Sequence, residues 1–246
     1  MRAFDRDYLL YASEGAIRLG AGAREWLLPP AFAAWIPAGT PIAFDLPHPV
    51  VTCSVLFAPG FCAAVRPAPP DRPVVFAMSP LAREMVRHAR RWGPDARDGP
   101  DGPDGDDART FFRALAGVAA ELAATPADVW RPASEDPSLA RALRYTEDHM
   151  GRAVTLGEVA AYAGLSERTL LRRYTRAFGL TWAQSLRRAR MIAATERLAT
   201  TGDPVTAIAF DVGYASLSAF NAAFRRFAGT TPGAVRRRGA GLNPGP

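Results

Sequence analysis

Residues 159–179 read VAAYAGLSERTLLRRYTRAFG, and residues 208–229 read IAFDVGYASLSAFNAAFRRFAG. Both stretches hold a short apolar pair, a glycine, and then a serine that precedes an amphipathic run ending at a second glycine. A short helix, a glycine-containing turn and a second helix with its own capping residue are typical of a helix-turn-helix, whose second helix enters the DNA major groove. Two such stretches predict a DNA reader. The matched positions are Ser166 and Ser216, Leu170 and Phe220, Tyr174 and Phe224, and Gly179 and Gly229.

Charge is distributed unevenly along the 246 residues, although an apolar fraction of 48% runs through the chain and excludes wholesale disorder. All 30 basic residues are arginines. The part up to Asp136 has 14 arginines and 17 acidic residues, a net charge of −3, and the remainder has 16 arginines and 7 acidic residues, a net charge of +9. A strongly basic second half joined to a weakly acidic first half indicates that the second half binds a polyanion such as nucleic acid.

Cysteine content and hydropathy indicate a cytoplasmic protein. Cys53 and Cys62 are too few for a disulfide framework or a cysteine-type zinc site, so we expect a reduced pair. The stretch Met1–Asp7 lacks the apolar core of a signal peptide, and no run of residues is long and apolar enough to cross a bilayer. We therefore expect no contact with a membrane and, for a DNA-binding protein, association with the chromosome.

The front part of the chain has the pattern of a small all-β barrel or sandwich. Short apolar runs rich in Val, Ile, Phe and Trp alternate with Gly and Pro, and the prolines fall too often for helices. The expected strands are Tyr8–Ala12, Ala16–Leu19, Glu25–Leu28, Ala33–Ile36, Pro41–Leu46, Val50–Phe57 and Val74–Met78.

Two amphipathic helices are expected after these strands. Ser79 caps the first, which runs to about Trp92, and the second carries Phe111. Between them Gly93–Asp107 is dense in Gly, Pro and Asp and is expected to be a mobile loop. These helices either cover the strands or form a dimer interface in which the Phe111 face packs on a partner.

From Ser138 onward the pattern is helical, and several residues mark helix starts. Thr155 and Glu158 form a capping box, and Ser166 and Ser216 cap the second helix of each repeated stretch. Asp203 followed by proline is expected to be a cap with proline in the first helical position.

The apolar positions of the two second helices predict which side of each faces away from the core. Arg can make a bidentate hydrogen bond to guanine, and Asn can make one to adenine, so an outward side that carries these residues can recognise bases. Any single arginine there could instead belong to a solvated face, but caps, turns, apolar faces and charge agree on DNA binding. The outward residues are Glu167, Arg168, Leu171, Arg172, Arg173 and Arg176 in the first helix, and Leu217, Ser218, Asn221, Ala222, Arg225 and Arg226 in the second.

A rigid unit that carries two such helices can place them in successive major-groove segments about 34 Å apart, and the footprint of one chain would be asymmetric. Arginines near the reading helices are expected to hold phosphates, which sets the register on DNA without reading sequence. These arginines are Arg173, Arg176, Arg187, Arg188, Arg190, Arg225, Arg226, Arg236, Arg237 and Arg238.

The second half resembles the AraC/XylS family of bacterial transcription regulators. The residues that carry the resemblance are Ile208-Ala209, Val212-Gly213-Tyr214, Ser216, Phe220, Phe224-Arg225-Arg226, Gly229 and Thr231-Pro232, together with Arg187, Arg190, Ala194 and Leu198 of the expected connecting helix. The resemblance covers about 110 residues and implies base contacts from Arg168, Leu171, Arg172, Leu217, Ser218 and Asn221. Two of these six are apolar and would contact thymine methyl groups.

More loosely, the front half resembles the cupin-type sensor domain of the same family, through Glu14-Gly15, Leu28-Pro29-Pro30 and the run Trp35–Thr40. Metal-binding cupins supply two or three His and a Glu. Here Thr40–Ile42 stands where many relatives have a His, and His48 is alone, so we expect no metal, no cofactor and no enzyme chemistry. The large inward side chains would contact a small organic effector, or simply fill the core: Trp26, Trp35, Phe44 and Phe57.

These observations predict an α+β multidomain protein. Residues 1–125 would form the cupin-like sensing and dimerisation domain with its two trailing helices, 126–137 a linker, 138–239 the double helix-turn-helix domain, and 240–246 a disordered tail. The predicted partners are operator DNA, a small effector, a second copy of the chain and RNA polymerase. A nonspecific DNA-binding protein, a cupin enzyme with an attached helical module, and a regulator without a ligand remain as alternatives.

Overall fold

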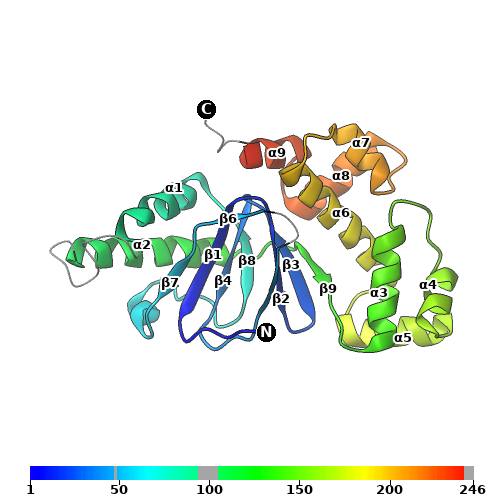
Figure 1. The fold of residues 1–246 in the computed structure, drawn as a ribbon, viewed down its shortest axis with the longest axis horizontal. Coiled ribbons are helices and arrows are strands. Elements are labelled where there is room, and N and C mark those ends of the chain that lie inside the picture. The colour runs from blue at the N-terminus through cyan, green and yellow to red at the C-terminus, as the bar shows by residue number, and fades with distance from the viewer. Residues whose placement is uncertain (47–48, 94–104, 241–246) are drawn as a thin grey trace. The chain divides into compact units, whose positions relative to one another are not determined.

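The computed structural model describes residues 1–46, 49–93 and 105–240 (Figure 1). Its first part is rich in strands and its second part is helical. By their internal contacts the elements group into two compact units. The β-rich unit contains β1, β4, β6, β7 and β8 with η1, α1, η2 and α2, and the helical unit contains β2, β3, β5 and β9 with α3 to α9.

The sheet of the β-rich unit is centred on β1 (Asp7–Glu14) and β4 (Phe32–Ile36), which run antiparallel with Leu9 opposite Trp35. β8 (Val74–Ala77) pairs with the other edge of β4, while β7 (Val55–Phe57) and β6 (Val51–Thr52) both pair with β1. The pairing of β1 with β6 contains a register shift between Ala12 and Glu14. Every residue of β4 is buried, as its unbroken apolar sequence predicts.

Helices cover the core of this unit. Ser79 caps α1 (Pro80–His88), its Oγ accepting from the Ala82 N–H at 3.1 Å, and the turn η2 (Ala89–Trp92) follows. The long helix α2 (Gly105–Ala123) buries Leu115 and Ala116 against the sheet side chains Trp35 and Phe76, while η1 (Phe61–Ala64) closes the same core.

The second sheet, in the helical unit, has the order β5-β2-β3-β9. Its strands are β2 (Ile17–Ala21), β3 (Arg24–Leu28), β5 (Ala43–Asp45) and β9 (Trp130–Pro132). β9 lies in the segment predicted as a linker and pairs antiparallel with β3, so that Trp26 stands opposite Trp130. This part of the chain is therefore built into a sheet.

The expected closed barrel is not confirmed, because the strands form two open sheets in the described part of the chain. The short strands at the ends of the two sheet orders, β6 at two residues and β5 and β9 at three, offer little backbone for further pairing. The mobile loop predicted at Gly93–Asp107 falls mainly outside the described residues, as do His48 and the tail from Gly241, although Gly105–Asp107 already belong to α2.

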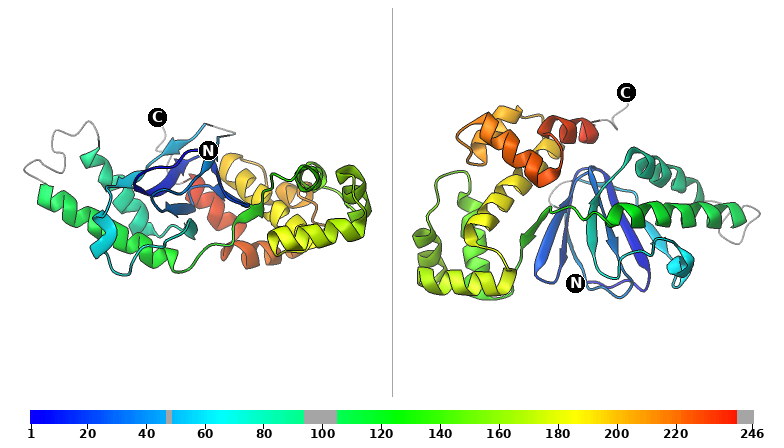
Figure 2. Two further views of the ribbon diagram at one scale, coloured as in Figure 1. Left: turned by 90° about the horizontal axis from the view of Figure 1, so that it is seen from below. Right: turned by 180° about the vertical axis from the view of Figure 1, so that it is seen from behind.

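Seven helices of the helical unit follow within the described residues: α3 (Pro137–His149), α4 (Leu156–Ala163), α5 (Glu167–Phe178), α6 (Trp182–Thr200), α7 (Val205–Asp211), α8 (Leu217–Ala228) and α9 (Pro232–Ala240). They pack around two apolar cores. α3, α4 and α5 surround a core that contains Tyr174 and Trp182, and α7, α8 and α9 surround one that contains Phe220 and Phe224. The long helix α6 contributes to both cores and connects the two groups (Figure 2). None of the described helices is long and apolar enough to span a membrane.

Candidate DNA-binding site

The pair α4 and α5 is shaped by local capping interactions that its sequence predicts. Thr155 and Glu158 form the expected capping box: the Thr155 N–H donates to Glu158 Oε2 at 2.7 Å, and the Glu158 N–H donates to Thr155 Oγ1 at 3.3 Å. Gly164 ends α4 with φ of 70°, a left-handed conformation that side chains rarely adopt. Ser166 Oγ then accepts from the Thr169 N–H at 3.3 Å and starts α5.

The pair α7 and α8 repeats this arrangement with one difference. Gly213 takes φ of 86° in the turn, and Ser216 Oγ accepts from the Ala219 N–H at 3.2 Å to cap α8. The predicted cap at Asp203 is wrong, because α7 begins after Pro204 without a side-chain cap. The Asp203 carboxylate instead accepts from Arg197 at 2.7 Å, so an ion pair takes the place of a capping bond.

Buried side chains fix how the two second helices are turned. Leu170 and Tyr174 of α5 and Phe220 and Phe224 of α8 are fully buried, at the matched positions of the sequence repeat. Each pair is one helical turn apart and packs into the core of its own helix group. The side of α5 that carries Arg168 and Arg172 faces outward, as the apolar pattern predicts, and so does Ser218 of α8, whereas Leu217 packs partly against the core.

The outward side of α5 is basic. Arg168, Arg172, Arg173 and Arg176 are exposed, and Leu171 among them is 40% exposed. Arg173 lies 3.8 Å from Asp136, a pair between exposed side chains that contributes little to stability and leaves the guanidinium accessible.

The outward side of α8 offers fewer polar groups. Ser218 is exposed, whereas Leu217 and Asn221 are half-buried. The Ser218 hydroxyl lies 3.2 Å from that of the capping Ser216. Arg225 and Arg226, in the last turn, are both exposed.

The structure separates the remaining predicted phosphate ligands into two kinds. Arg187 and Arg237 are exposed. Arg190 donates to two backbone carbonyl groups, and Arg236 donates to the carbonyl of Asp203. Arg188 also points to internal partners, since its Nη2 lies 2.5 Å from Asp128 Oδ2 and its guanidinium covers the Trp130 ring. Arg238 lies outside the residues whose side chains the structure describes.

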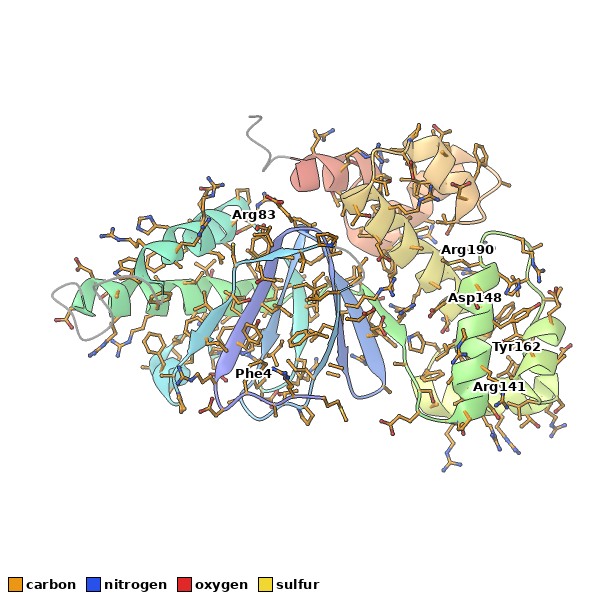
Figure 3. The ribbon with its side chains drawn as sticks, in the orientation of Figure 1. Phe4, Arg83, Arg141, Asp148, Tyr162 and Arg190 are labelled. Carbon is orange, nitrogen blue, oxygen red and sulfur yellow. The ribbon has the colours of Figure 1, made fainter. Side chains whose placement is uncertain are left out.

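Sequence reasoning missed one residue that holds the turn between α4 and α5. Arg141 of α3 donates through Nη2 to the Ala163 carbonyl at 2.9 Å, immediately before Gly164 (Figure 3). This bond satisfies one of the free carbonyl groups at the end of α4. The helical pattern of α3 places Arg141 on its surface but cannot identify a partner 22 residues away.

The four predicted effector contacts are divided between the two units, two in each. Trp35 and Phe57 stack in the core of the β-rich unit, with ring centroids 5.4 Å apart. Trp26 is buried in the helical unit, and Phe44 of β5 is 37% exposed. No group of three or more potential metal ligands occurs among the described side chains.

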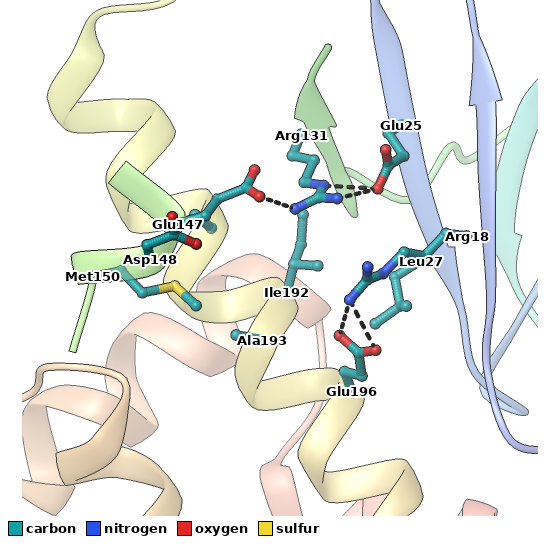
Figure 4. A pocket seen from close by; sticks show the side chains of 11 residues that line it. Arg18, Glu25, Leu27, Arg131, Glu147, Asp148, Met150, Ile192, Ala193 and Glu196 are labelled. Atoms are coloured by element: carbon teal, nitrogen blue, oxygen red, sulfur yellow. Dashed lines mark hydrogen bonds and ion pairs between the residues drawn. The ribbon is translucent and has the colours of Figure 1, made fainter. Parts of the chain in front are cut away.

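A charged cavity that the sequence did not predict lies inside the helical unit, between its sheet and helices α3 and α6 (Figure 4). Its volume is about 280 Å³. Arg131 of β9 donates through Nε to Glu25 at 2.8 Å and lies 2.6 Å from Glu147 of α3. Arg18 of β2 donates to both carboxylate oxygens of Glu196 of α6 at 3.2 Å. Burial raises the pKa of the Glu147 carboxyl, and the charge of Arg131 opposes that shift.

Comparison with known proteins agrees with this geometry. A family described as a helix-turn-helix domain matches residues 159–238, which include part of α4 and all of α5, α7 and α8. The chain is 25% identical over 237 residues to the HTH-type transcriptional regulator NimR of Escherichia coli K12, covering 96% of this chain and 81% of NimR. It is 36% identical over 102 residues to the HTH-type transcriptional activator RhaS of Escherichia fergusonii, covering 42% of this chain and only 37% of RhaS.

A shorter relative is matched over nearly its whole length. The regulatory protein SoxS of Salmonella typhimurium is 30% identical over 96 residues, which cover 39% of this chain and 90% of SoxS. These relatives are transcription regulators and not enzymes. The chain belongs to the AraC family of DNA-binding transcription regulators.

Proposed function

We propose that α4 with α5 and α7 with α8 are two helix-turn-helix units, and that α5 and α8 enter successive major-groove segments of one operator. The observation that carries this proposal is the matched geometry of the two pairs. Each has a left-handed glycine in its turn, a serine cap at the start of its second helix, and two fully buried side chains one turn apart. Such a pair presents the front of its second helix to DNA.

In this arrangement the front residues of each helix read base edges. Arg168 and Arg172 can form a fork to guanine, Asn221 can pair with adenine, and Leu171 can contact a thymine methyl group. Leu217 and Ser218 complete the set on α8. Exposed arginines would hold the phosphates on either side: Arg173, Arg176, Arg187, Arg225, Arg226 and Arg237. Arg190 and Arg236 are left out of this set, because their guanidinium groups already donate to backbone carbonyls.

The front of the chain would supply sensing and assembly. We propose that sensing and dimerisation belong to residues 1–125 and DNA reading to residues 138–239, with residues 126–137, which contain β9, as the connecting segment. A small organic effector near Trp26, Trp35, Phe44 or Phe57 would regulate DNA binding only by favouring one arrangement of the protein over another. A second copy of the chain would pack on the Phe111 face, and RNA polymerase is the proposed target of the DNA-bound protein.

Selection of bound fragments from a random DNA library by the full-length chain tests the central proposal. We expect a bipartite motif, one part read by each helix. In Arg172→Ala, one or two positions of the first part should lose preference, at about 1–3 kcal/mol for a guanine contact. Arg87→Ala removes the same charge from an exposed position of α1, outside both helix pairs, and is the matched control, which should leave the motif unchanged.

Two results would contradict the proposal. Equal affinity for selected and random sequences would make the chain a nonspecific DNA-binding protein. Uniform weakening on all sequences in Arg172→Ala would make this residue a phosphate contact and not a base reader.

A further inference from the structure

Arg190, in the middle of α6, connects the two helix groups through backbone carbonyls. Its Nε donates to the Met150 carbonyl at 2.9 Å, and its Nη2 donates to the Arg152 carbonyl at 3.0 Å. Both acceptors lie between α3 and α4, in the first helix group, whereas α6 also forms part of the second core. Figure 3 labels Arg190 at this position on α6.

The same guanidinium lies against the turn of the second helix pair. A Cβ atom built on Gly213 would stand 2.7 Å from Arg190 Nη2 and 2.5 Å from the Met150 carbonyl oxygen. A Cβ atom on Gly151 would stand 2.5 Å from the carbonyl oxygen of Asp211. Real Cβ atoms do not approach backbone this closely, so the two glycines allow the α3–α4 loop and the α7–α8 turn to meet directly.

The charge of Arg190 has no carboxylate partner among the described residues, although the side chain is half-buried. Because the half-buried position removes part of the water around the charge, it lowers the pKa of the guanidinium. Hydrogen bonds from a charged donor to carbonyl groups offset this loss of hydration, and the planar fork of arginine reaches both acceptors at once. A side chain in this setting is committed to internal contacts.

We propose that Arg190 is a positioning residue that fixes the separation and rotation between α5 and α8, and thereby the number of base pairs that the protein accepts between the two parts of its operator. This inference rests on the proposed function, since it assumes that both helices read DNA. The residues that contact Arg190 or adjoin those contacts are here called the Arg190 junction: Met150, Gly151, Arg152, Asp211 and Gly213.

DNA geometry explains why this junction matters for spacing. One base pair added between two half-elements moves the second by about 3.4 Å and turns it by about 35°, since a turn of about 10–10.5 base pairs spans about 34–36 Å. A rigid junction cannot follow such a turn without losing contacts at one half-element. If the junction is loosened, α6 remains as the connection, and small rotations between the helix groups can accommodate a neighbouring spacing.

The test uses the full-length chain and DNA that carries both half-elements of its selected motif, separated by the natural spacer or by one or two base pairs more or fewer. For the natural protein we expect about a tenfold or greater loss of affinity per base pair of change, similar to a mismatched contact. In Arg190→Ala this penalty should fall to a few-fold, while the affinity for an isolated half-element should stay within about twofold.

Two further variants keep the test decisive. Arg190→Lys keeps the charge but cannot donate to both carbonyl groups, so it should also relax the spacing preference. If Arg190→Ala fails to fold, Arg190→Lys alone tests the role of Arg190. Arg187→Ala removes an exposed arginine from the same helix. It should weaken binding at every spacing by a similar factor and keep the preference of the natural protein.

The inference is overturned if folded Arg190→Ala and Arg190→Lys keep the full spacing preference. It is also overturned if Arg190→Ala behaves as Arg187→Ala does, with uniform weakening and a smaller dependence on salt, because Arg190 would then be a phosphate ligand. Failure of the proposed function is distinguishable: the natural protein itself would then select no bipartite motif.

Discussion

The ion-pair triad of Arg131, Glu25 and Glu147 provides the sharpest test of how the sheet and helices of the helical unit are held together. Arg131 of β9 lies between two carboxylates, one on β3 and one on α3 (Figure 4). The perturbation is Arg131→Met, which keeps the aliphatic bulk of the side chain and removes its charge. It leaves two carboxylates facing each other with no cation between them.

The expected loss of stability follows from the burial of the three side chains. They are 19%, 27% and 30% exposed for Arg131, Glu25 and Glu147. Breaking a fully buried pair costs about 3–5 kcal/mol, whereas a fully exposed pair contributes about 0–1 kcal/mol. The triad lies between these limits, so we expect Arg131→Met to lower the free energy of unfolding by about 2 kcal/mol at neutral pH.

The pH dependence gives a second signature. Burial already raises the pKa of Glu147, and loss of Arg131 raises it further because the opposing charge is gone. A carboxyl whose pKa is higher in the folded state stabilises the fold most below its unfolded pKa, and this contribution is lost as pH rises through the folded pKa. The deficit of Arg131→Met should therefore be largest near neutral pH and should shrink as the pH is lowered towards the ordinary glutamate value.

Urea denaturation of the full-length chain, followed by circular dichroism and tryptophan fluorescence, measures the effect. Arg87→Met is the matched control, because Arg87 pairs with Glu84 on the surface, where both side chains are more than half exposed. The double variant Arg131→Met/Glu147→Gln should recover much of the lost stability, since it removes one of the two negative charges that would otherwise face each other. Equal, small losses for Arg131→Met and Arg87→Met, or a deficit that does not change with pH, would refute the reasoning.

Three shorter predictions concern the reading domain. Phe224→Ala should lower the free energy of unfolding by about 3–5 kcal/mol, because it leaves a cavity in a fully buried core; a loss below 1 kcal/mol in urea denaturation would contradict this packing. Hydrogen bonds from the Thr155 backbone and from Arg152 lower the pKa of Glu158 to about 2 from its ordinary 4.5. Its stabilising contribution is thus present above pH 4.5 and lost as pH falls through 2, so the unfolding curves of the natural protein and Glu158→Gln should differ at pH 7 and converge in strong acid. If about six phosphates are contacted, DNA affinity should fall by about three orders of magnitude between 50 and 200 mM salt, and a flat salt dependence in a filter-binding assay would exclude those contacts.

Most of the local structure could be predicted from the sequence, because the signals that set it act over a few residues. The strand around Ala33–Ile36 and the helix after Ser79 lie where their patterns place them. Caps at Ser166 and Ser216 form as expected, since each serine hydroxyl needs only the N–H group three residues later. These elements need no information from distant parts of the chain.

What the sequence did not predict depends on distant partners. β9 forms in a proline-containing stretch with weak strand character, because β3 offers it an edge about a hundred residues away in the chain. Arg131 finds Glu25 across the same distance, and neither residue carries a pattern that identifies the other. Asp203 has the form of a capping residue, yet the guanidinium of Arg197 competes successfully for its carboxylate.

Comparison of the two helix pairs separates the residues that form their common fold from the residues that differ on their outward sides. The two pairs agree at their capping serines, their turn glycines and their fully buried side chains, so each pair forms the same scaffold from its own short sequence. They disagree at the outward positions, where Arg168 and Arg172 of α5 contrast with Ser218 and Asn221 of α8. Because the scaffold is equal and the outward chemistry is not, the two helices should prefer different base pairs. Such a protein would bind its operator in one orientation only. The side of the protein that faces a promoter would then depend on the orientation of the operator sequence.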